Sequence, residues 1–399
     1  MHDWIAPAVR VLAWICLVPA FCGSLYCILT MISMIWLRRA PVRHQMPDPE
    51  FRPSVTILKP VHGLEKNQRE NLRSTCMQDY PDFQVVFSAQ DLDDPVIPLL
   101  LEIQKEFGAD RVSVAVEQRT CGPNGKINNM VGGLPYAKHE ILVISDSDIR
   151  LRPDYLKSIV SPLADPSVGC ACTLYKVACA DTWYEKFELL TLNAELMPNM
   201  VFAHVTGFSK FCLGASMALR QSTLREIGGL ESLADYLVED FEIGRRIWSS
   251  EKKVAIVPYL VETIVDLKSP SDWWSHFVYW DQNHRSARPI GFFATALIRS
   301  VPFALLYMLL SLGANEGLVV LAGALAVRLV TAGVILGWGL RDREGLRSLW
   351  LLPFRDLVAL VVWAAAQTKG TTIWRGREFD LTRDGRLVAR VDKSQRIAD

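Results

Sequence analysis

The sequence has no excess of either charge, no internal repeat and no disulfide framework. Its 399 residues include 43 lysines and arginines and 43 aspartates and glutamates, so the formal net charge is zero. A chain with balanced charge gives no indication of nucleic-acid binding or of a strongly acidic partner. The nine cysteines are odd in number and lack disulfide-like spacing, which favours a reducing compartment over an oxidising one.

The cysteines also lack the partners of a zinc set. Cys170, Cys172 and Cys179 lie close together in the sequence, but no second C-x-x-C pair or histidine pair accompanies them. Free cysteine is among the most frequently buried residue types. The pattern therefore favours buried or incidental thiols over a metal site.

Apolar residues make up 50% of the chain, which is too many for an ordinary soluble enzyme of this length. The first concentration of them, residues 8–36, is long enough to span a bilayer with some tilt and too long for a cleaved signal peptide. Arg38, Arg39 and Arg43 follow at once, so the positive-inside tendency places the next domain in the cytoplasm. We expect residues 1–40 to form an N-terminal transmembrane anchor.

The second concentration of apolar residues begins after Pro289. Two apolar runs, 291–312 and 317–340, are joined by a short connection without a basic residue. A short connection of this kind suits a helical hairpin whose tip lies outside the cell. We therefore expect a transmembrane hairpin over residues 289–341.

A third apolar run, residues 349–366, contains Arg355 and Asp356. Charges within a helix cost about 2.5–3.5 kcal/mol each on membrane-insertion scales. The residues after the run are basic, and a spanning helix would place them outside, against the charge bias. We therefore expect residues 342–399 to form an interfacial or re-entrant helix and a basic cytoplasmic tail.

The middle of the chain, residues 41–288, alternates short β-type runs with helical stretches. Strands are expected at 55–58, 84–88, 112–116 and 141–144, and helices at 67–77 and 95–107. Alternation of this kind predicts an α/β domain with a mostly parallel sheet. Ligands of such sheets bind beyond the carboxyl ends of the strands, which is where the polar motifs of this chain fall.

Two carboxylates follow the last of these strands. Asp146 and Asp148 are two residues apart, and residues at that spacing along a strand point to the same side. Hard oxygen ligands at a strand end suit Mg²⁺ or Mn²⁺ bridging a diphosphate. Acidic turns are also common, so the pair alone fits either a metal–nucleotide site or an ordinary turn.

Three further polar segments each have a structural explanation beside a functional one. Asp91 is placed to contact a nucleotide, whereas Asp94 before Pro95 is typical of a helix N-cap. Lys126 lies in a segment rich in glycine and asparagine, which suits phosphate binding or a plain loop. Asp240 lies among other carboxylates, which suits a general base or a solvated helix start.

The order and spacing of these segments resemble the ceramide glucosyltransferase family (glycosyltransferase family 21) and, behind it, the inverting GT-A glycosyltransferases. The resemblance covers most of the chain and is carried by Ile57–Pro60, Gln78–Pro81, Gln90–Pro95, Lys126–Asn129, Asp146–Ser147, Val205–Phe208 and Glu239–Asp240. It implies a Rossmann-like GT-A domain of α/β class with a mostly parallel sheet, between N-terminal and C-terminal transmembrane helices.

The resemblance also implies roles for individual residues. In that family three aspartates act in turn, and they match Asp91 for nucleotide contact, Asp146 for the metal–diphosphate and Asp240 as the catalytic base. Asp148 resembles a second metal ligand. The remaining residues that the resemblance places in the nucleotide-sugar site are Pro60, Lys126, Glu239, Gln282 and Arg285.

One motif departs from the family pattern. The family's closing motif reads Q/R-x-x-R-W, and here Ser286 follows Gln282 and Arg285 where the tryptophan is expected. Arg285 is still expected to meet the diphosphate leaving group. The missing indole removes an apolar wall near the acceptor, so the departure bears on the acceptor's identity more than on the class of reaction.

The resemblance implies transfer of a hexose, glucose, from a UDP-sugar to the hydroxyl of a lipid such as ceramide, with inversion and with Mg²⁺ or Mn²⁺. One alternative is another lipid acceptor, such as a hopanoid or diacylglycerol, with another UDP-hexose. The other is a membrane scaffold that retains an inactive transferase domain. The expected partners are the UDP-sugar, the lipid acceptor and the bilayer, and the expected location is the bacterial inner membrane with the catalytic domain in the cytoplasm.

Overall fold

The computed structural model describes residues 5–39, 50–208, 210–312, 314–368, 371–374, 377–382 and 385–389. The chain divides into two compact units, which we call the helical unit and the sheet unit. The helical unit comprises Met1–Arg39, Ala178–Gly207 and Leu267–Gly370, and the sheet unit comprises Ala40–Val177, Phe208–Asp266 and Thr371–Asp399. The domain boundaries expected from the sequence, at residues 40, 288 and 341, remain predictions.

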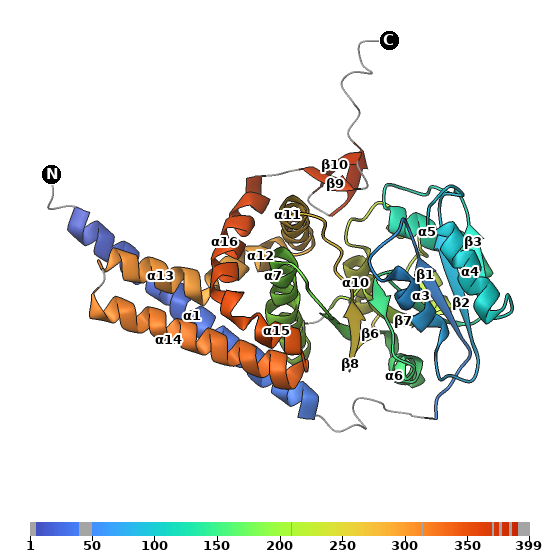
Figure 1. The fold of residues 1–399 in the computed structure, drawn as a ribbon, viewed down its shortest axis with the longest axis horizontal. Helices are drawn as coiled ribbons and strands as arrows, with labels where there is room; N and C mark the ends of the chain where they lie inside the picture. Colours follow the sequence, from blue (N-terminus) through green and yellow to red (C-terminus); the bar gives the residue numbers. More distant parts are fainter. Residues whose placement is uncertain are drawn as a thin grey trace, which may run out of the picture. The chain divides into compact units, whose positions relative to one another are not determined.

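The sheet unit is built on an eight-stranded sheet (Figure 1). In sheet order the strands are β3 (Val112–Val116), β2 (Phe83–Ala89), β1 (Val55–Pro60), β4 (Ile141–Ser145), β7 (Ser216–Arg220), β6 (Val168–Val177), β8 (Lys253–Thr263) and β5 (Ile149–Arg150). Strands β3, β2, β1 and β4 run parallel, whereas β7 and β5 run antiparallel to their neighbours. The sheet is therefore mixed and mostly parallel, and the predicted fold class is confirmed.

The strands of the parallel half of the sheet contain many β-branched residues. Every residue of β1, β2 and β4 is buried. Strands buried on both faces read as continuous apolar runs, because helices cover a parallel sheet on both sides. The four strands predicted from such runs all lie within β1 to β4, so these predictions are confirmed.

Short helices connect the strands of the sheet unit. They are α3 (Gln68–Cys76), α4 (Ile97–Phe107), α5 (Gly125–Gly133), α6 (Tyr155–Val160), α9 (Gln221–Glu226) and α10 (Glu239–Ser249). The helix expected from Pro95 begins at Ile97, because Pro95 and Val96 form a turn in front of it. Asp94 stabilises that turn, since its Oδ1 accepts a hydrogen bond from the Val96 N–H at 2.9 Å.

A second, three-stranded sheet follows the last helix of the chain. Its antiparallel strands are β9 (Thr371–Trp374), β10 (Arg377–Leu381) and β11 (Leu387–Ala389). The N–H of Leu387 donates a hydrogen bond to the Asp235 carbonyl at 2.8 Å, which attaches this small sheet to the sheet unit. The basic tail expected from the sequence therefore contains β-structure, and its last residues lie outside the described part of the chain.

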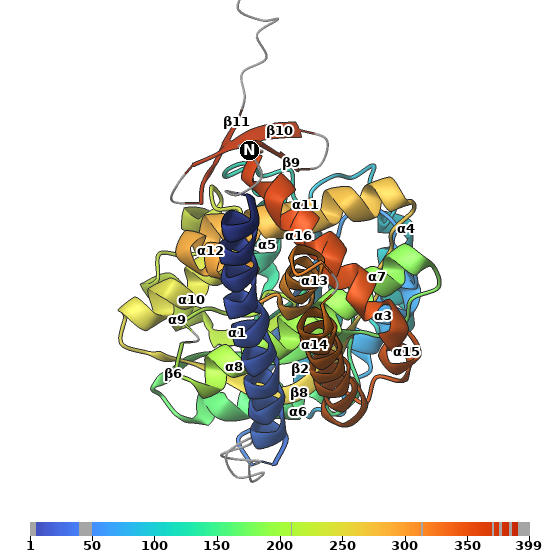
Figure 2. The same cartoon turned by 90° about the vertical axis from the view of Figure 1, so that its left-hand side faces the viewer.

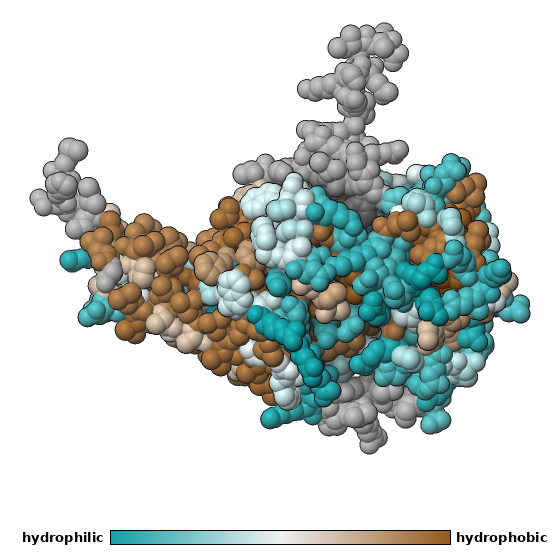
Figure 3. All heavy atoms as spheres, in the orientation of Figure 1, coloured by the Kyte–Doolittle hydropathy of each residue, from teal (hydrophilic) through white to brown (hydrophobic). Residues whose placement is uncertain are grey.

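The helical unit contains the apolar helices. They are α1 (Ile5–Arg39), α7 (Trp183–Thr191), α8 (Met197–Val205), α11 (Pro270–Ala287), α12 (Pro289–Leu297), α13 (Ser300–Leu310), α14 (Asn315–Val334), α15 (Arg343–Arg347) and α16 (Leu352–Thr368). Helix α1 packs along α13 and α14 (Figure 2). Apolar residues cover the exposed surface of these three helices (Figure 3).

Three helical segments of the described chain are long and apolar enough to cross a membrane, namely Ala8–Arg39, Asn315–Gly339 and Leu349–Gln367. Helices α12 and α13 would form a fourth crossing if the pair counts as one span, although they meet at a bend of 47°. Pro302 lies in the first turn of α13 and has no N–H to donate across the bend, so a helix break costs little there.

The charged residues within α16 are paired. Asp356 accepts hydrogen bonds from Arg328 of α14, at 2.7 Å from Nε and 3.2 Å from Nη2. Arg355 donates to Asp356 at 2.9 Å and also pairs with Glu195, which lies between α7 and α8. Charges within membrane helices are tolerated when they face the bundle interior and pair with one another. The pairing weakens the objection to a span at 349–366, and the interfacial or re-entrant helix expected there remains a prediction.

Candidate active site

The Asp146–Asp148 pair follows β4 and is anchored through its backbone. The Asp146 N–H donates to the Ala215 carbonyl at 3.1 Å, and the Ile149 N–H returns to the Asp146 carbonyl at 3.2 Å. Asp148 is held at the end of β8, because the Thr263 hydroxyl donates to its Oδ2 and the Ile264 N–H donates to its carbonyl at 3.2 Å. The two aspartates therefore lie in a turn, which was one of the two interpretations of the pair in the sequence. The turn holds both carboxylates at the carboxyl edge of the sheet.

Lys126 joins two of the predicted site residues. Its Nζ lies 2.6 Å from Asp146 Oδ1 and 2.9 Å from Glu239 Oε1. Burial lowers the pKa of Lys126, but the charges of Asp146 and Glu239 outweigh burial and hold that pKa well above its ordinary value. Lys126 is therefore a permanent positive charge between two carboxylates, which is a suitable partner for a phosphate.

The segment around Lys126 is a capped helix start. Asn124 is the N-cap of α5, and its Oδ1 accepts from the N–H groups of Lys126 and Ile127 at 2.9 and 3.1 Å. Its Nδ2 donates to the Tyr236 carbonyl at 2.8 Å and to Glu239 Oε2 at 3.3 Å. One side chain therefore satisfies the first N–H groups of α5 and links that helix to the first residue of α10.

Asp240 lies in the first turn of α10. Its Oδ2 accepts a hydrogen bond from the Gly214 N–H at 2.8 Å, and its Oδ1 accepts from the Phe241 N–H at 2.7 Å. Burial, followed by the neighbouring charge of Glu239, raises the pKa of Asp240 to about 7. A carboxylate that titrates near neutrality, held by backbone donors, has the properties of a general base.

Gly214 is required at its position by the space around Asp240. A Cβ atom on Gly214 would lie 2.7 Å from Asp240 Oδ2, closer than real Cβ atoms approach other atoms. The absence of a side chain therefore lets the Gly214 N–H reach the carboxylate.

Two residues near the aspartate pair were not predicted from the sequence. Lys59 is fully buried in β1, where its Nζ donates to Ser145 Oγ and to the Ile149 carbonyl, each at 3.2 Å, and burial lowers its pKa to about 8. Glu65 accepts from the Ser147 hydroxyl at 2.8 Å, and burial, with the charge of Asp148 next, raises its pKa to about 7. Lys59 could have been noticed in the sequence, because it is a lysine inside an otherwise uncharged strand. No feature of the sequence indicated a role for Glu65.

Pro60 and Asp91 occupy the same edge of the sheet. Pro60 is the last residue of β1, and Asp91 follows β2. Asp91 is exposed and accepts from the Asp93 N–H at 3.0 Å within its own turn. Asp94 points elsewhere, because its carboxylate also accepts from the Gly63 N–H at 2.9 Å. The N-cap of α4 is Val96 and has no side-chain cap, so the N-cap expected at Asp94 is wrong: Asp94 stabilises the turn before the helix instead, and Asp91 is exposed for the predicted nucleotide contact.

Comparison with known proteins places this site in a family. Residues 12–387 match the family described as Glycosyl transferase family 21. The chain belongs to glycosyl transferase family 21. The predicted recognition is thereby confirmed.

Named relatives of this family 21 chain are ceramide glucosyltransferases. Ceramide glucosyltransferase 1 of Caenorhabditis elegans is 29% identical over 215 residues, which cover 53% of this chain and 45% of the relative. Ceramide glucosyltransferase 3 of the same organism is 25% identical over 233 residues, covering 57% and 50%. The chain therefore spans about half the length of the curated relatives it matches.

A solved structure supports the fold of this family 21 chain. The mannosyltransferase PcManGT from Pyrobaculum calidifontis, in complex with GDP-Man and Mn²⁺, aligns with a TM-score of 0.55 at 19% identity, covering 90% of this chain and 98% of that one. At this identity the likeness concerns the fold, and it agrees with the predicted GT-A class.

The closing motif of the family 21 chain belongs to the helical unit. Gln282 is buried on α11. Arg285, one turn further along the same helix, donates from Nη1 to the Gln367 carbonyl at 2.9 Å. In the sheet unit the structure brings together Lys126, Asp146, Glu239 and Asp240. Gln282 and Arg285 belong to the helical unit. Their part in the site remains a prediction.

The aspartate pair has suitable donors for a divalent cation. Asp146 is a partly buried carboxylate whose charge is opposed by Lys126, and desolvation raises its pKa. Asp148 uses Oδ2 for the Thr263 hydroxyl. Magnesium-type ions are held by one or two carboxylates together with substrate phosphates and waters, so the donor set fits such an ion.

Proposed function

We propose that this family 21 chain transfers glucose from a UDP-sugar to the hydroxyl of ceramide, with inversion at the sugar carbon. The observation that carries the proposal is the partly buried carboxylate of Asp240, whose pKa is raised to about 7 beside the cluster of Lys126, Asp146 and Glu239. The names of its relatives support the reaction, and the apolar helices suit an acceptor confined to a bilayer.

Asp240 is the proposed catalytic base. At neutral pH a group with a pKa of about 7 is partly ionised, so it can accept the proton of an attacking hydroxyl. The Gly214 and Phe241 N–H groups hold the carboxylate in one orientation. The acceptor oxygen then attacks the anomeric carbon as UDP leaves from the opposite face, which inverts the configuration.

Asp146 and Asp148 would hold Mg²⁺ or Mn²⁺. A bound divalent ion neutralises the charge that develops on a leaving diphosphate. Lys126, now paired with Asp146 and Glu239, supplies a second positive charge for a phosphate oxygen. The mannosyltransferase of similar fold was solved with Mn²⁺ and a nucleotide sugar, which agrees with this assignment.

The other predicted residues receive their roles by family resemblance. Pro60 and Asp91 lie at the sheet edge where the nucleotide is proposed to bind. Gln282 and Arg285 are proposed to meet the diphosphate, and Glu239 positions Lys126.

The membrane placement is also a proposal. Arg38 and Arg39 close the first span, so by the positive-inside tendency the sheet unit faces the cytoplasm of the bacterial inner membrane. There it meets a soluble UDP-sugar, while the lipid acceptor enters from the bilayer.

A substrate panel tests the proposal. Membranes containing the chain are incubated with several UDP-hexoses and with ceramide, a hopanoid or diacylglycerol, and products are identified by mass spectrometry. Hexosylceramide formed with UDP-glucose, and abolished by EDTA, is expected. If product formed only on the hopanoid or only on diacylglycerol, that lipid would replace ceramide as the proposed acceptor. If no sugar were transferred to any lipid, the chain would more closely fit an inactive scaffold.

A further inference from the structure

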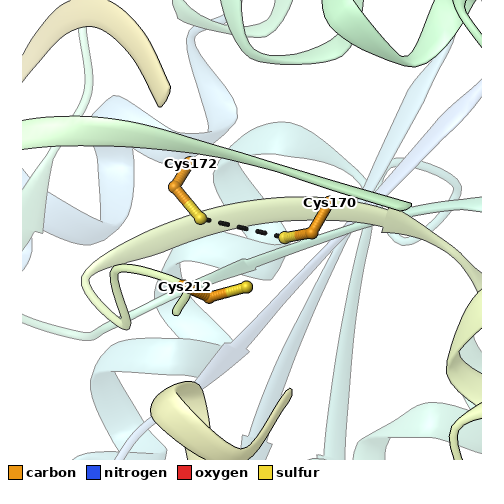
Figure 4. Close-up of side chains that lie close together, drawn as sticks. All are labelled: Cys170, Cys172 and Cys212. Atoms are coloured by element: carbon orange, nitrogen blue, oxygen red, sulfur yellow. Dashed lines mark hydrogen bonds between the residues drawn. The ribbon is translucent and has the colours of Figure 1, made fainter. Parts of the chain in front are cut away.

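Three thiols from separate parts of the chain meet inside the sheet unit (Figure 4). Cys170 and Cys172 lie two residues apart on β6, and Cys212 lies in the irregular segment before β7. The three sulfur atoms all lie within 4.8 Å of one another, and those of Cys170 and Cys172 are 3.8 Å apart. All three residues are buried.

The spacing of the sulfur atoms matches a metal–thiolate site. Zinc–sulfur bonds of about 2.3 Å in a tetrahedral arrangement place two sulfur ligands about 3.8 Å apart. Thiolates select soft ions, whereas carboxylates select Mg²⁺ and Mn²⁺. The three thiols therefore differ in ligand chemistry from the Asp146–Asp148 pair.

We propose that Cys170, Cys172 and Cys212 form a binding site for one thiophilic divalent d¹⁰ ion of the zinc and cadmium type. On binding, bonds from sulfur to the metal replace S–H bonds, and the protons pass to solvent. Loss of all three thiol protons leaves three thiolates around a divalent ion, a centre of net charge −1, and the Leu213 N–H that donates to Cys172 Sγ at 3.3 Å stabilises this charge. The inference is independent of the proposed function, because it concerns different atoms and a different ligand.

The segment that carries Cys212 also donates a hydrogen bond to the carboxylate of Asp240. The Leu213 N–H donates to Cys172 Sγ at 3.3 Å, and the next residue, Gly214, donates to Asp240 Oδ2 at 2.8 Å. Gly244 on α10 has no side chain where a Cβ would lie 2.4 Å from the Cys212 nitrogen. The thiol site and the carboxylate are thus joined by three consecutive residues, Cys212 to Gly214.

Cadmium binding tests the site directly. The full chain, purified in detergent, reduced and freed of metal, is titrated with Cd²⁺ in excess Mg²⁺, which fills oxygen sites. Binding is followed by the ultraviolet charge-transfer band from thiolate to cadmium. We expect one tightly bound Cd²⁺ per chain, displaced by Zn²⁺.

Matched cysteine variants distinguish this site from other thiols. Loss of outer-shell partners alone weakens metal sites by about 10- to 100-fold, so Cys172→Ser, Cys212→Ser and Cys212→Ala should each weaken binding by at least about tenfold. Cys76→Ser removes a buried thiol elsewhere in the sheet unit and should bind as the wild type does. Circular dichroism establishes that each variant is folded. Absence of the band in the wild type, or its persistence in folded Cys172→Ser or Cys212 variants, would overturn the proposal.

Discussion

At the scale of single residues, the properties of Asp240 follow from its surroundings. A carboxyl group is ordinarily ionised at neutral pH, but burial and the charge of Glu239 raise its pKa to about 7. A base acts when deprotonated, so kcat/KM, which reports the ionisation of the free enzyme, should rise with pH and reach half its maximum near pH 7. Asp240→Asn should lower kcat about 100- to 10,000-fold, the usual contribution of a general base, and leave UDP-sugar affinity little changed. Steady-state kinetics across pH measure both effects.

Glu242→Gln is the matched control for Asp240→Asn. Glu242 is also a buried carboxylate on α10, but it pairs with Arg245 and Arg246, each at 2.7 Å. Loss of the Glu242 charge should lower the stability of the protein. The pH dependence of the remaining activity should stay that of the wild type. If Asp240→Asn kept the wild-type rate and pH dependence, Asp240 would not be the base.

Gly214 provides a second test at the residue scale. Gly214→Ala would place a Cβ 2.7 Å from Asp240 Oδ2, so the carboxylate or the segment must shift. We expect kcat to fall about tenfold or more, since removal of one aligned donor costs about 1.5–3 kcal/mol when the acceptor is charged. Gly323→Ala is the control, because a Cβ there meets no atom within 4 Å. Equal kinetics for both variants would contradict the role of Gly214.

At the scale of elements, the start of α5 is tied to the start of α10 by Asn124. Asn124→Ala removes the N-cap together with the hydrogen bonds from Nδ2 to the Tyr236 carbonyl and to Glu239. Loss of an N-cap costs about 0.5–2 kcal/mol, and the lost hydrogen bond adds to this. We expect the unfolding free energy of the sheet unit to fall by about 1–3 kcal/mol, measured by chemical denaturation in detergent.

Asn124→Ser separates the two contributions. A serine hydroxyl can still accept from the first N–H groups of α5, but it has no amide to donate to the Tyr236 carbonyl and Glu239. This variant should recover most of the stability lost in Asn124→Ala while activity stays reduced, because Glu239 also holds Lys126. Identical stability of the two variants would show that the cap contributes little.

The elements of the site differ in how far the sequence predicts them. The strands β1 to β4 were predictable, because four buried parallel strands leave continuous apolar runs. The segment around Lys126 looked equally like a loop, since the value of Asn124 as a cap depends on the helix that follows. Glu65 was not predictable, because its hydrogen bond to Ser147 joins residues 82 positions apart.

At the scale of the whole molecule, buried ion pairs tie distant apolar helices together. Arg328 on α14 and Asp356 on α16 lie 2.7 Å apart and are both buried. Removing one partner of a buried pair typically costs about 3–5 kcal/mol, whereas replacing both by apolar residues is often neutral. We expect Arg328→Met and Asp356→Leu each to lower the thermal stability in detergent, and the double variant to recover only part of the loss, because Arg355 also donates to Asp356. A double variant as unstable as the sum of the two would contradict this account.

The division into two units was less visible in the sequence than the fold class. Helices α7 and α8 belong to the helical unit and contain no long apolar run. In the sequence, however, they come between β6 and β7 of the large sheet. Their assignment depends on contacts such as that of Phe202 with Tyr26 of α1, with ring centroids 5.1 Å apart. The thiol cluster escaped prediction for the same reason, because Cys212 lies far along the chain from Cys170 and Cys172.

The stereochemistry of the transferred sugar tests the central claim most directly. The purified chain is given UDP-glucose, Mg²⁺ or Mn²⁺ and ceramide, and the anomeric configuration of the product is read from its proton coupling by nuclear magnetic resonance. A single displacement assisted by Asp240 predicts a β-linked glucosylceramide from the α-linked donor, and almost none from Asp240→Asn. An α-linked product, or β-linked product formed by Asp240→Asn at the wild-type rate, would contradict it.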